Sequence, residues 1–287
     1  MKVAVLPNLS RNRAEYHTER LLQRLRGFGA EVLMKQELQK NFASSGAAFY
    51  KDFDEMISAC DLIIALGGDG TIIHSAKHAA AFDKPILGVN VGRLGFLAEL
   101  ETDEFDELKK LVSGDFRVEN RMMIGIRYTE NGQEKTCSAL NDAVFTRDTL
   151  SAMPDFHVAF NGQTVCEYRG DGLILSTPTG STGYSLSAGG PIIDPQLMCI
   201  LLSPICSHSL LTRPVVFGPD AKLSVRTDLR PESTVYLIVD GETSVKIDSP
   251  RKIQFCRSDK TVKIVRLKNH NFYEIVNKKL GDRRNDL

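Results

Sequence analysis

A five-residue segment combines small side chains with a carboxylate and a hydroxyl: Gly67-Gly68-Asp69-Gly70-Thr71. Glycines let the main chain approach a phosphate closely, and a helix that begins after them offers unpaired N–H donors at the positive end of its dipole. We therefore expect an anion at this turn. A carboxylate beside an anion is unfavourable unless it accepts a proton, holds a metal or accepts a hydrogen bond from a hydroxyl, which gives Asp69 a candidate chemical role. The structural alternative is that Asp69 caps the helix.

The residues on either side of this turn predict the elements that position it. Leu62–Leu66 is an apolar run too short for an independent helix, and it is typical of a buried parallel strand. Ile72–Ala81 places its apolar residues on one face of a helix. The lysine of a standard phosphate loop and the spaced glycines of a dinucleotide fingerprint are both absent here, so neither of those classes applies.

A second polar segment runs from Arg169 to Pro191 and is rich in hydroxyl groups and glycines. Serine and threonine hydroxyls can hold phosphate or ribose oxygens, and Tyr184 can stack on a flat ring or hydrogen-bond to it. The apolar run inside this segment, Gly172–Ser176, and the apolar pair after Pro191 favour a buried binding segment. The alternative is a long, flexible surface loop.

Asn141 and Asp142 form a polar pair inside an apolar stretch. Adjacent residues of a strand point to opposite faces, so at least one of the two side chains would be buried, at a cost of about a few kcal/mol unless it is paired. A ligand could provide that partner. A simple turn or bulge at this position is the alternative.

Strand and helix patterns alternate through the N-terminal part of the chain, which predicts an α/β domain with a parallel sheet wrapped by helices. In such sheets ligands bind at the carboxyl ends of the strands, where Gly67–Thr71 and Asn90–Phe96 both fall. Apart from the two elements above, the predicted strands are Lys2–Pro7, Glu31–Met34 and Pro85–Asn90, and the predicted helices are Arg13–Phe28, Ala43–Ser58 and Asp103–Val112.

From residue 121 onward the pattern changes to short alternating or β-branched runs, which predicts a second, all-β, sandwich-like domain. Three dipeptides typical of hairpin turns separate some of them: Asn131-Gly132, Asn161-Gly162 and Asp240-Gly241. We expect the α/β domain over residues 1–118 and the β-rich domain over 119–267. The segment 268–287 is a candidate addition to the first domain, with a helix over Asn271–Lys279 and a polar tail over 281–287. The predicted strands are Met123–Tyr128, Ala139–Thr146, His157–Phe160, Gly172–Ser176, Val215–Phe217, Lys222–Arg226, Thr234–Val239, Lys252–Arg257 and Thr261–Arg266.

The composition is that of an ordinary soluble globular protein: of 287 residues, 42% are hydrophobic and 25% are charged. Lys plus Arg and Asp plus Glu both number 36, so no net field attracts nucleic acid or an acidic membrane. No apolar run approaches the roughly 20 residues that span a bilayer, and the N-terminal apolar stretch is too short for a secretory signal, which predicts a cytoplasmic protein. The six cysteines are widely spaced, so we expect reduced thiols rather than a zinc site or a disulfide framework.

Taken together, these segments resemble the NAD kinase family, whose members phosphorylate NAD to NADP with ATP or polyphosphate. The glycine motif alone is shared with 6-phosphofructokinases and diacylglycerol-type lipid kinases, whereas the hydroxyl-rich motif is far more specific. The order and spacing of the motifs agree with the family over roughly residues 61–216. The matching segments are Leu66–Thr71, Asn90–Leu97, Leu140–Asp142, Asp171-Gly172, Ser176–Thr182 and Tyr184–Pro191.

The resemblance implies transfer of the γ-phosphoryl group of ATP, or of a phosphoryl group of polyphosphate, to the 2′-hydroxyl of the adenosine ribose of NAD. It implies Asp69 as the general base, an active site between the two domains, and a homodimer or homotetramer in which Arg169 reaches a neighbouring subunit's site. Phosphoryl transfer needs charge neutralisation, so Mg²⁺ or another divalent metal is expected with ATP, and no residue is identified as its ligand. The implied nucleotide contacts are Gly70, His74, Phe96, Asn141, Asp142, Arg169, Asp171, Thr182, Gly183, Tyr184, Ser185, Leu186 and Ser187.

Two positions depart from the family pattern: Gly183 replaces the usual alanine, and Glu242 stands where glutamine is expected. One enzyme alternative is a related kinase acting on a lipid or sugar, although a lipid kinase should have an apolar cleft in place of the hydroxyl-rich segment. A catalytically silent NAD(P)-binding regulator is the alternative of another class, and the intact Asp69 argues against it. His74 and His78 have the spacing of metal ligands, but we interpret them as helix-surface residues because the glutamate of the zinc-protease pattern is missing.

Overall fold

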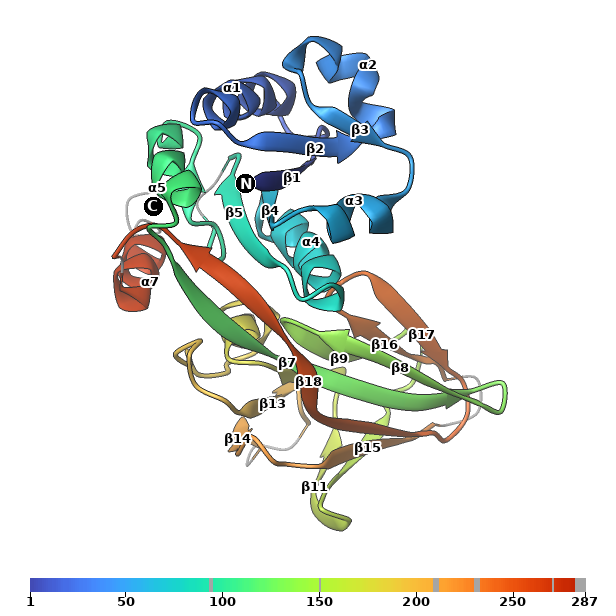
Figure 1. Cartoon of the computed structure of the whole chain (residues 1–287). Coiled ribbons are helices and arrows are strands. Elements are labelled where there is room, and N and C mark those ends of the chain that lie inside the picture. Colours follow the sequence, from blue (N-terminus) through green and yellow to red (C-terminus); the bar gives the residue numbers. More distant parts are fainter. Residues whose placement is uncertain (93–94, 150, 209–211, 230–232, 270, 282–287) are drawn as a thin grey trace. The chain divides into compact units, whose positions relative to one another are not determined.

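The computed structural model describes residues 1–92, 95–149, 151–208, 212–229, 233–269 and 271–281 (Figure 1). The chain forms two compact units: unit 1 consists of Met1–Asn120 and the chain from Val262 onward, and unit 2 is Arg121–Thr261. The second boundary lies before the sequence-based one at 267 because a single long strand, β18 (Lys252–Arg266), continues from unit 2 into unit 1. No helix within the described ranges is long and apolar enough to cross a membrane.

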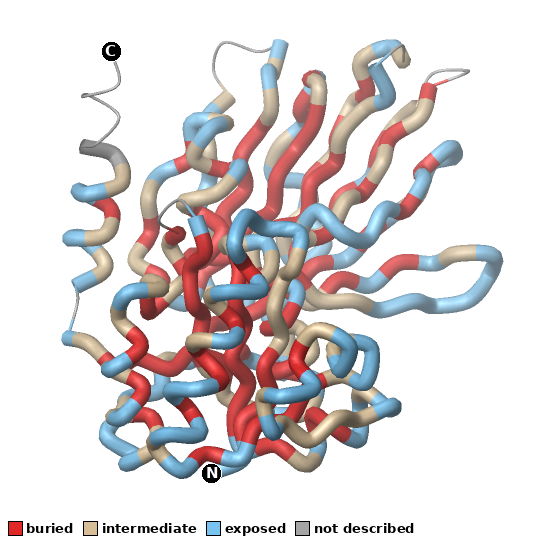
Figure 2. Tube along the Cα trace, turned by 90° about the horizontal axis from the view of Figure 1, so that it is seen from above, coloured by how far each residue is buried: buried red, intermediate tan, exposed pale blue. Residues whose placement is uncertain are grey.

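Unit 1 is built on a parallel sheet, which confirms the predicted α/β domain. The strand order is β3-β2-β1-β4-β5, and the last part of β18 pairs with β5, also in parallel. Buried residues form continuous stretches along β1, β2, β4 and β5 (Figure 2), as is typical of parallel strands covered on both faces. The elements are β1 (Lys2–Pro7), α1 (Ala14–Gly27), β2 (Glu31–Lys35), α2 (Gln39–Phe42), β3 (Ala48–Tyr50), α3 (Phe53–Ala59), β4 (Leu62–Gly67), α4 (Asp69–Ala81), β5 (Pro85–Asn90), β6 (Leu100–Glu101), α5 (Leu108–Ser113) and α7 (Phe272–Gly281).

Helices cover both faces of this sheet. Leu21, Leu22 and Leu25 of α1 are buried in one core with alternate residues of β1, β2 and β4. On the opposite face α4 packs against β5, where a Cβ atom added to Gly88 would lie 2.6 Å from Cδ1 of Ile72. This packing fixes the start of α4 relative to the carboxyl end of β4.

The predicted helix over Ala43–Ser58 is wrong. The chain instead makes the short strand β3, parallel to β2, and then the separate helix α3. Gly46 has a φ of 69°, which ends the preceding helical turn, and the Asp52 carboxylate accepts a hydrogen bond from Glu55 N at 2.7 Å as the N-cap of α3. The other helices and strands predicted for unit 1 are present.

Unit 2 consists of two antiparallel sheets that share one core, which confirms the predicted sandwich-like domain. One sheet has the order β14-β13-β12-β9-β16-β17, and the other contains β11-β10-β15-β18 with the hairpin β7-β8 paired to β18. The Phe145 ring contacts those of Phe156 and Phe255 edge-to-face, each at 5.9 Å between centroids. The elements are β7 (Arg117–Glu130), β8 (Gln133–Ala139), β9 (Asp142–Arg147), β10 (Asp155–Phe160), β11 (Gln163–Arg169), β12 (Gly172–Ser176), α6 (Tyr184–Ser187), β13 (Ile200–Ile205), β14 (Val215–Phe217), β15 (Leu223–Asp228), β16 (Val235–Val239), β17 (Thr243–Ile247) and β18.

The three predicted hairpin turns are present, and both residues of each dipeptide have positive φ, as a type I′ turn requires. Sequence patterns nevertheless miss the strands β8, β11 and β17, since most residues of these strands are exposed and polar. They also miss β13, whose apolar run contains Pro204. The end of the predicted polar tail, residues 282–287, lies outside the described residues.

Candidate functional site

Asp69 lies at the junction of β4 and α4, with its carboxylate turned toward the loop after β5. Oδ2 accepts a hydrogen bond from Phe96 N at 2.9 Å, and Oδ1 accepts one from Leu97 N at 3.2 Å. The N-cap of α4 is Gly68, without a side-chain cap, so the interpretation of Asp69 as a simple helix cap is wrong. The Asp69 side chain is 30% exposed, which leaves its carboxylate accessible to a hydroxyl.

Gly95 makes this close approach of loop and carboxylate possible. A Cβ atom at Gly95 would lie 2.0 Å from Oδ1 of Asp69, far inside any real contact distance. Glycine is therefore required here. Residues 93–94, which belong to the same motif, lie outside the described residues.

The loop that supplies these N–H groups is anchored at both ends. At its start, Nδ2 of Asn90 donates hydrogen bonds to the Gly92 carbonyl oxygen at 3.1 Å and to Oε2 of Glu101 at 2.8 Å. Burial raises the pKa of the Glu101 carboxyl above its ordinary value, and the hydrogen bond from Asn90 opposes that rise. At its end, the Glu99 carboxylate accepts hydrogen bonds from two main-chain N–H groups that follow β18.

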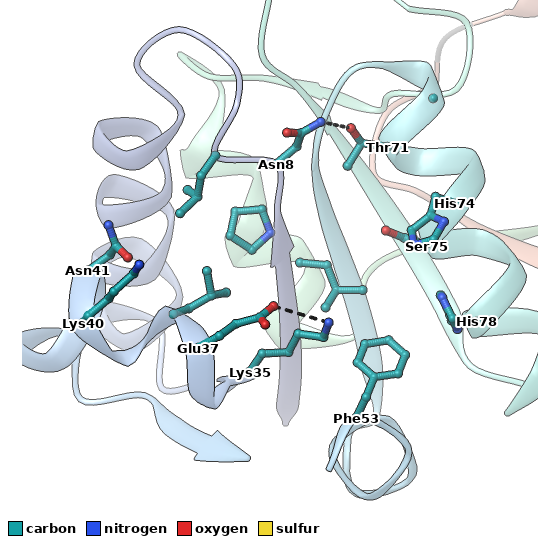
Figure 3. A pocket seen from close by; sticks show the side chains of 15 residues that line it. Asn8, Lys35, Glu37, Lys40, Asn41, Phe53, Thr71, His74, Ser75 and His78 are labelled. Carbon is teal, nitrogen blue, oxygen red and sulfur yellow. Dashed lines mark hydrogen bonds and ion pairs between the residues drawn. The ribbon is translucent and has the colours of Figure 1, made fainter. Parts of the chain in front are cut away.

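A cavity of about 880 Å³ lies beside the N-terminus of α4 (Figure 3). It is at the carboxyl ends of β1 and β2, the edge where parallel sheets bind ligands. Nδ2 of Asn8 donates a hydrogen bond to Oγ1 of Thr71 at 3.0 Å on one wall. Two predicted contact residues, Gly70 and His74, are part of the lining, which comprises Leu6, Pro7, Asn8, Leu9, Lys35, Glu37, Leu38, Lys40, Asn41, Phe53, Gly70, Thr71, His74, Ser75 and His78.

The walls of this cavity carry charged and aromatic side chains, and Lys35 Nζ pairs with Oε1 of Glu37 at 3.4 Å. Lys35 Nζ lies 4.9 Å from the ring centroid of Phe53, and the Phe53 ring packs edge-to-face on His78 at 4.7 Å. The His78 ring packs in the same way on His74 at 5.0 Å, so both histidines belong to the cavity wall. Within the described part of the chain, no three His, Cys, Asp or Glu side chains gather as metal ligands. A cavity of this size beside a helix start fits a phosphorylated nucleotide.

In unit 2, Asn141 and Asp142 lie at the corner between β8 and β9. The Asp240 carboxylate holds this corner through three main-chain groups: Oδ2 accepts from Leu140 N at 2.9 Å, and Oδ1 accepts from Asn141 N and Asp142 N at 2.8 and 3.0 Å. The corner is thus a turn, which was the alternative expected from the sequence for Asn141 and Asp142. Asp142 begins the following strand, β9. Its fixed backbone sets the direction of both side chains.

The hydroxyl-rich segment packs directly on this corner. Thr177 N donates a hydrogen bond to the Asn141 carbonyl oxygen at 2.8 Å, and a Cβ atom at Gly180 would lie 2.2 Å from that same oxygen. A Cβ atom at Gly183 would lie 3.8 Å from Nδ2 of Asn141 and 4.0 Å from Oδ2 of Asp142, but only 3.2 Å from the Gly180 carbonyl oxygen. The structure therefore brings Asn141, Asp142 and Gly183 together, and alanine at Gly183 would require the Gly180 carbonyl to shift by a few tenths of an ångström.

Asn141 carries an unused hydrogen-bond acceptor. Its Oδ1 atom is buried and has no hydrogen-bond partner among the described residues. A buried acceptor without a donor costs about 1–3 kcal/mol. An N–H or O–H group of a ligand at this position would remove that cost.

The predicted contacts on α6 differ in accessibility. Ser185 is fully buried, and its Oγ lies 2.8 Å from Oγ of Ser203, so its hydroxyl faces the core of unit 2. Tyr184 is 49% exposed. The predicted contacts of this segment that are at least partly accessible are Thr182, Gly183, Tyr184, Leu186 and Ser187.

Within one chain, Arg169 and Asp171 lie apart from Asn141, Asp142 and the hydroxyl-rich segment. They precede β12, whereas Thr177 follows it, and the five residues of β12 span about 17 Å at about 3.3 Å per residue. Asp171 Oδ1 accepts a hydrogen bond from Arg147 Nε at 2.7 Å, and Arg169 pairs with Asp155 at 3.1 Å. Both predicted residues therefore lie at the opposite end of the strand from Asn141.

Sequence reasoning missed Asp240, which holds the Asn141 corner. The available signal was a carboxylate at the first position of a hairpin turn, but its partners lie 98 to 100 positions earlier in the chain.

We expect Asp240→Ala to lower the free energy of unfolding by about 1–3 kcal/mol, since three N–H groups lose their acceptor. Urea denaturation measures this effect. Asp248→Ala is the control, because that side chain is 57% exposed and makes only a 3.8 Å ion pair with Lys246. A urea midpoint equal to that of the control would contradict the assigned role.

Two family models match most of the chain. The model described as the ATP-NAD kinase N-terminal domain matches residues 3–116, and the ATP-NAD kinase C-terminal domain matches residues 140–267. An NAD kinase of Citrifermentans bemidjiense is 34% identical over 281 residues, covering 97% of this chain and 98% of the relative. An NAD kinase of Magnetococcus marinus is 43% identical over 236 residues, covering 81% and 77%.

Two solved structures are similar to this chain. An NAD kinase from Archaeoglobus fulgidus in complex with ATP has a TM-score of 0.73 at 27% identity and covers 96% of both chains. A yeast NADH kinase complexed with NADH has a TM-score of 0.88 at 23% identity, covering 98% of this chain and 87% of that one, and this likeness concerns the fold alone. The helix α7 lies beyond both spans matched by the family models.

Proposed function

The chain belongs to the NAD kinase family, and on this basis we propose that it transfers the γ-phosphoryl group of ATP to the 2′-hydroxyl of the adenosine ribose of NAD. The observation that carries this proposal is the carboxylate of Asp69, which two N–H groups hold at the end of β4 while it remains partly exposed. Phosphoryl transfer needs a positioned hydroxyl, a group that orients it or takes its proton, and charge neutralisation. A cytoplasmic location is part of this proposal.

In this reaction Asp69 acts as the general base. Its carboxylate accepts the proton of the 2′-hydroxyl as the hydroxyl oxygen bonds to the γ-phosphorus, the bond from that phosphorus to the bridging oxygen breaks, and ADP leaves. Asn141, Asp142 and the accessible part of α6 hold the dinucleotide. The unpaired Oδ1 of Asn141 supports this assignment because adenosine offers N–H and O–H donors.

We assign the cavity of unit 1 to the phosphoryl donor. The N–H groups that begin a helix lack acceptors within it and suit phosphate oxygens, and Lys40 adds positive charge to the lining, whereas Lys35 pairs with Glu37 of the same lining at 3.4 Å. The aromatic wall around Phe53 suits a flat base. The described residues offer no cluster of metal ligands, so Mg²⁺ would enter bound to the donor's phosphates, as is usual for this ion.

Arg169 and Asp171 act at a different place from Asn141 and Asp142. Their position at the far end of β12 supports a contact with the nucleotide of a neighbouring copy, in a homodimer or homotetramer. The intramolecular partners Asp155 and Arg147 hold the two side chains in place.

The direct test is incubation of the purified protein with NAD, ATP and Mg²⁺, followed by measurement of NADP with an NADP-specific dehydrogenase. Folded protein that forms no NADP would contradict the proposal and favour a silent NAD(P)-binding regulator. Phosphorylation of a lipid or sugar in place of NAD would favour a related kinase. Parallel reactions with polyphosphate and with NADH define the range of donors and acceptors.

The donor assignment predicts the effect of Thr71→Val. This change keeps the branched shape but removes the hydroxyl that lies in the cavity lining and accepts from Asn8. We expect the KM for ATP to rise about tenfold, as for loss of one hydrogen bond to a charged group, while the KM for NAD stays within twofold. Thr129→Val, at an exposed position of β7, is the control. Equal KM values for ATP in the two variants would exclude Thr71 from the donor site.

A further inference from the structure

A lysine from the C-terminal helix stands beside the carboxylate of Asp69. Nζ of Lys279, in α7, lies 3.8 Å from Oδ2 of Asp69 and 3.8 Å from the ring centroid of Phe96. Phe96 is the residue whose N–H group donates to the same Oδ2 atom. Asp69 and Phe96 both belong to the loop-and-carboxylate assembly around Asp69, and all three residues are in unit 1.

The contact between Lys279 and Asp69 is not a tight structural ion pair. A charge-assisted N–H···O bond is usually about 2.7–2.9 Å long, whereas the Nζ–Oδ2 distance is 3.8 Å. The two side chains are 28% and 30% exposed, and ion pairs with such access to water contribute about 0–1 kcal/mol to stability. The ammonium is thus held near the carboxylate in a place that a substrate anion can also reach.

The entry to α7 is fixed to the loop that holds Asp69. Oε1 of Glu99 accepts hydrogen bonds from Leu267 N at 2.8 Å and from Lys268 N at 2.7 Å, and its Oε2 pairs with Nη1 of Arg266 at 3.0 Å. Glu99 and Arg266 are both buried. Val276, on the inner face of α7, is 8% exposed. These hydrogen bonds fix the chain that leads toward α7, and the helix that carries Lys279 buries Val276.

We propose that Lys279 is a further catalytic residue of the phosphoryl transfer, whose ammonium neutralises the transferred phosphoryl group beside the base. A hydroxyl that donates to Asp69 places the attacked phosphorus about 3–3.5 Å from the hydroxyl oxygen before reaction, within reach of a lysine held next to that carboxylate. Negative charge spreads over the phosphoryl oxygens in the transition state, and a fixed cation there stabilises it. Lys279 gives up no proton: the proton goes to Asp69 and the electron pair to the leaving ADP. This inference rests on the proposed function.

The test compares two substitutions at Lys279 with one at its neighbour. Lys279→Met keeps the straight apolar stem and removes the charge, Lys279→Arg keeps the charge, and Lys278→Met is the matched control at an exposed position of the same helix. We expect Lys279→Met to lower kcat about 100-fold, with the Kd for NAD within threefold of wild type. Lys279→Arg should retain at least about a tenth of wild-type kcat, and the control should be unchanged.

A kcat of Lys279→Met within threefold of wild type would overturn the inference. So would an equal loss in Lys279→Arg, or an equal loss in the Lys278→Met control, because either result would indicate a role of the helix rather than of the charge. Thermal unfolding of each variant shows whether α7 still packs, and an unfolded Met variant is replaced by Lys279→Gln under the same criteria. Wild-type protein that makes no NADP would instead refute the proposed function, so the two failures are distinguishable.

Discussion

Asp69→Asn is expected to lower kcat for NADP formation by about 10²–10⁴-fold, which is the usual contribution of a positioned general base. The asparagine side chain has the same shape, and its Oδ1 atom can still accept a hydrogen bond from Phe96 N or Leu97 N, which donate to the native carboxylate at 2.9 and 3.2 Å. It cannot take the proton of the ribose hydroxyl. We therefore expect the loss in kcat, with NAD binding still measurable by titration.

Asp61→Asn provides the control for this variant. Asp61 precedes the same strand, β4, at its other end, and its carboxylate accepts a hydrogen bond from Lys2 N at 2.7 Å. That change removes one charge from the same unit without touching the loop after β5, so kcat should be unaffected. Full activity of Asp69→Asn would remove Asp69 from the role of base, whereas loss of NAD binding together with activity would indicate a structural role.

Gly95→Ala is expected to lower kcat about 100-fold without abolishing folding. The new methyl group would lie 2.0 Å from Oδ1 of Asp69, so either the carboxylate or the loop must move by more than about 1 Å. A displacement of that size at a reacting group can cost 10²-fold in rate. Steady-state kinetics with saturating NAD and ATP measure the effect.

Gly27→Ala is the matched control for that variant. Gly27 ends α1, and a Cβ atom there would meet nothing within 4 Å. Alanine at this place should leave the rate unchanged and, as a better helix former, leave stability equal or higher. Normal kcat in Gly95→Ala would show that the carboxylate position tolerates the methyl group and would contradict the tight coupling between loop and base.

The parts of the site that the sequence predicts are those encoded in contiguous residues. Asp69 and its glycine turn could be identified because a strand, the turn and a helix follow one another within one short stretch. The hairpin dipeptides were equally local, since positive φ at both positions favours Asn, Asp and Gly. Local propensity was sufficient in these cases.

The parts that were missed depend on contacts between distant positions. Asp240 acts on main-chain N–H groups about 100 positions earlier, and its own surroundings in the sequence show only a turn. Lys279 lies in a short helix of mixed apolar and charged residues near the end of the described chain, and only the fold brings it to Asp69. The strand β3 was missed for a related reason, because pairing with β2 overrides the helical pattern around Phe49.

The passage of β18 from unit 2 into unit 1 also has a consequence for biosynthesis. Unit 2 is one continuous piece of chain, whereas unit 1 needs residues that the ribosome adds only after unit 2 is finished. Until Lys263 and Ile264 have been made, β5 lacks its partner in β18, and Asp69 lacks Lys279 until α7 has been made. Domains generally fold as they are synthesised, N-terminal first. Here the second unit can fold before the first is complete, and a nascent or prematurely terminated chain that ends before α7 carries Asp69 without Lys279.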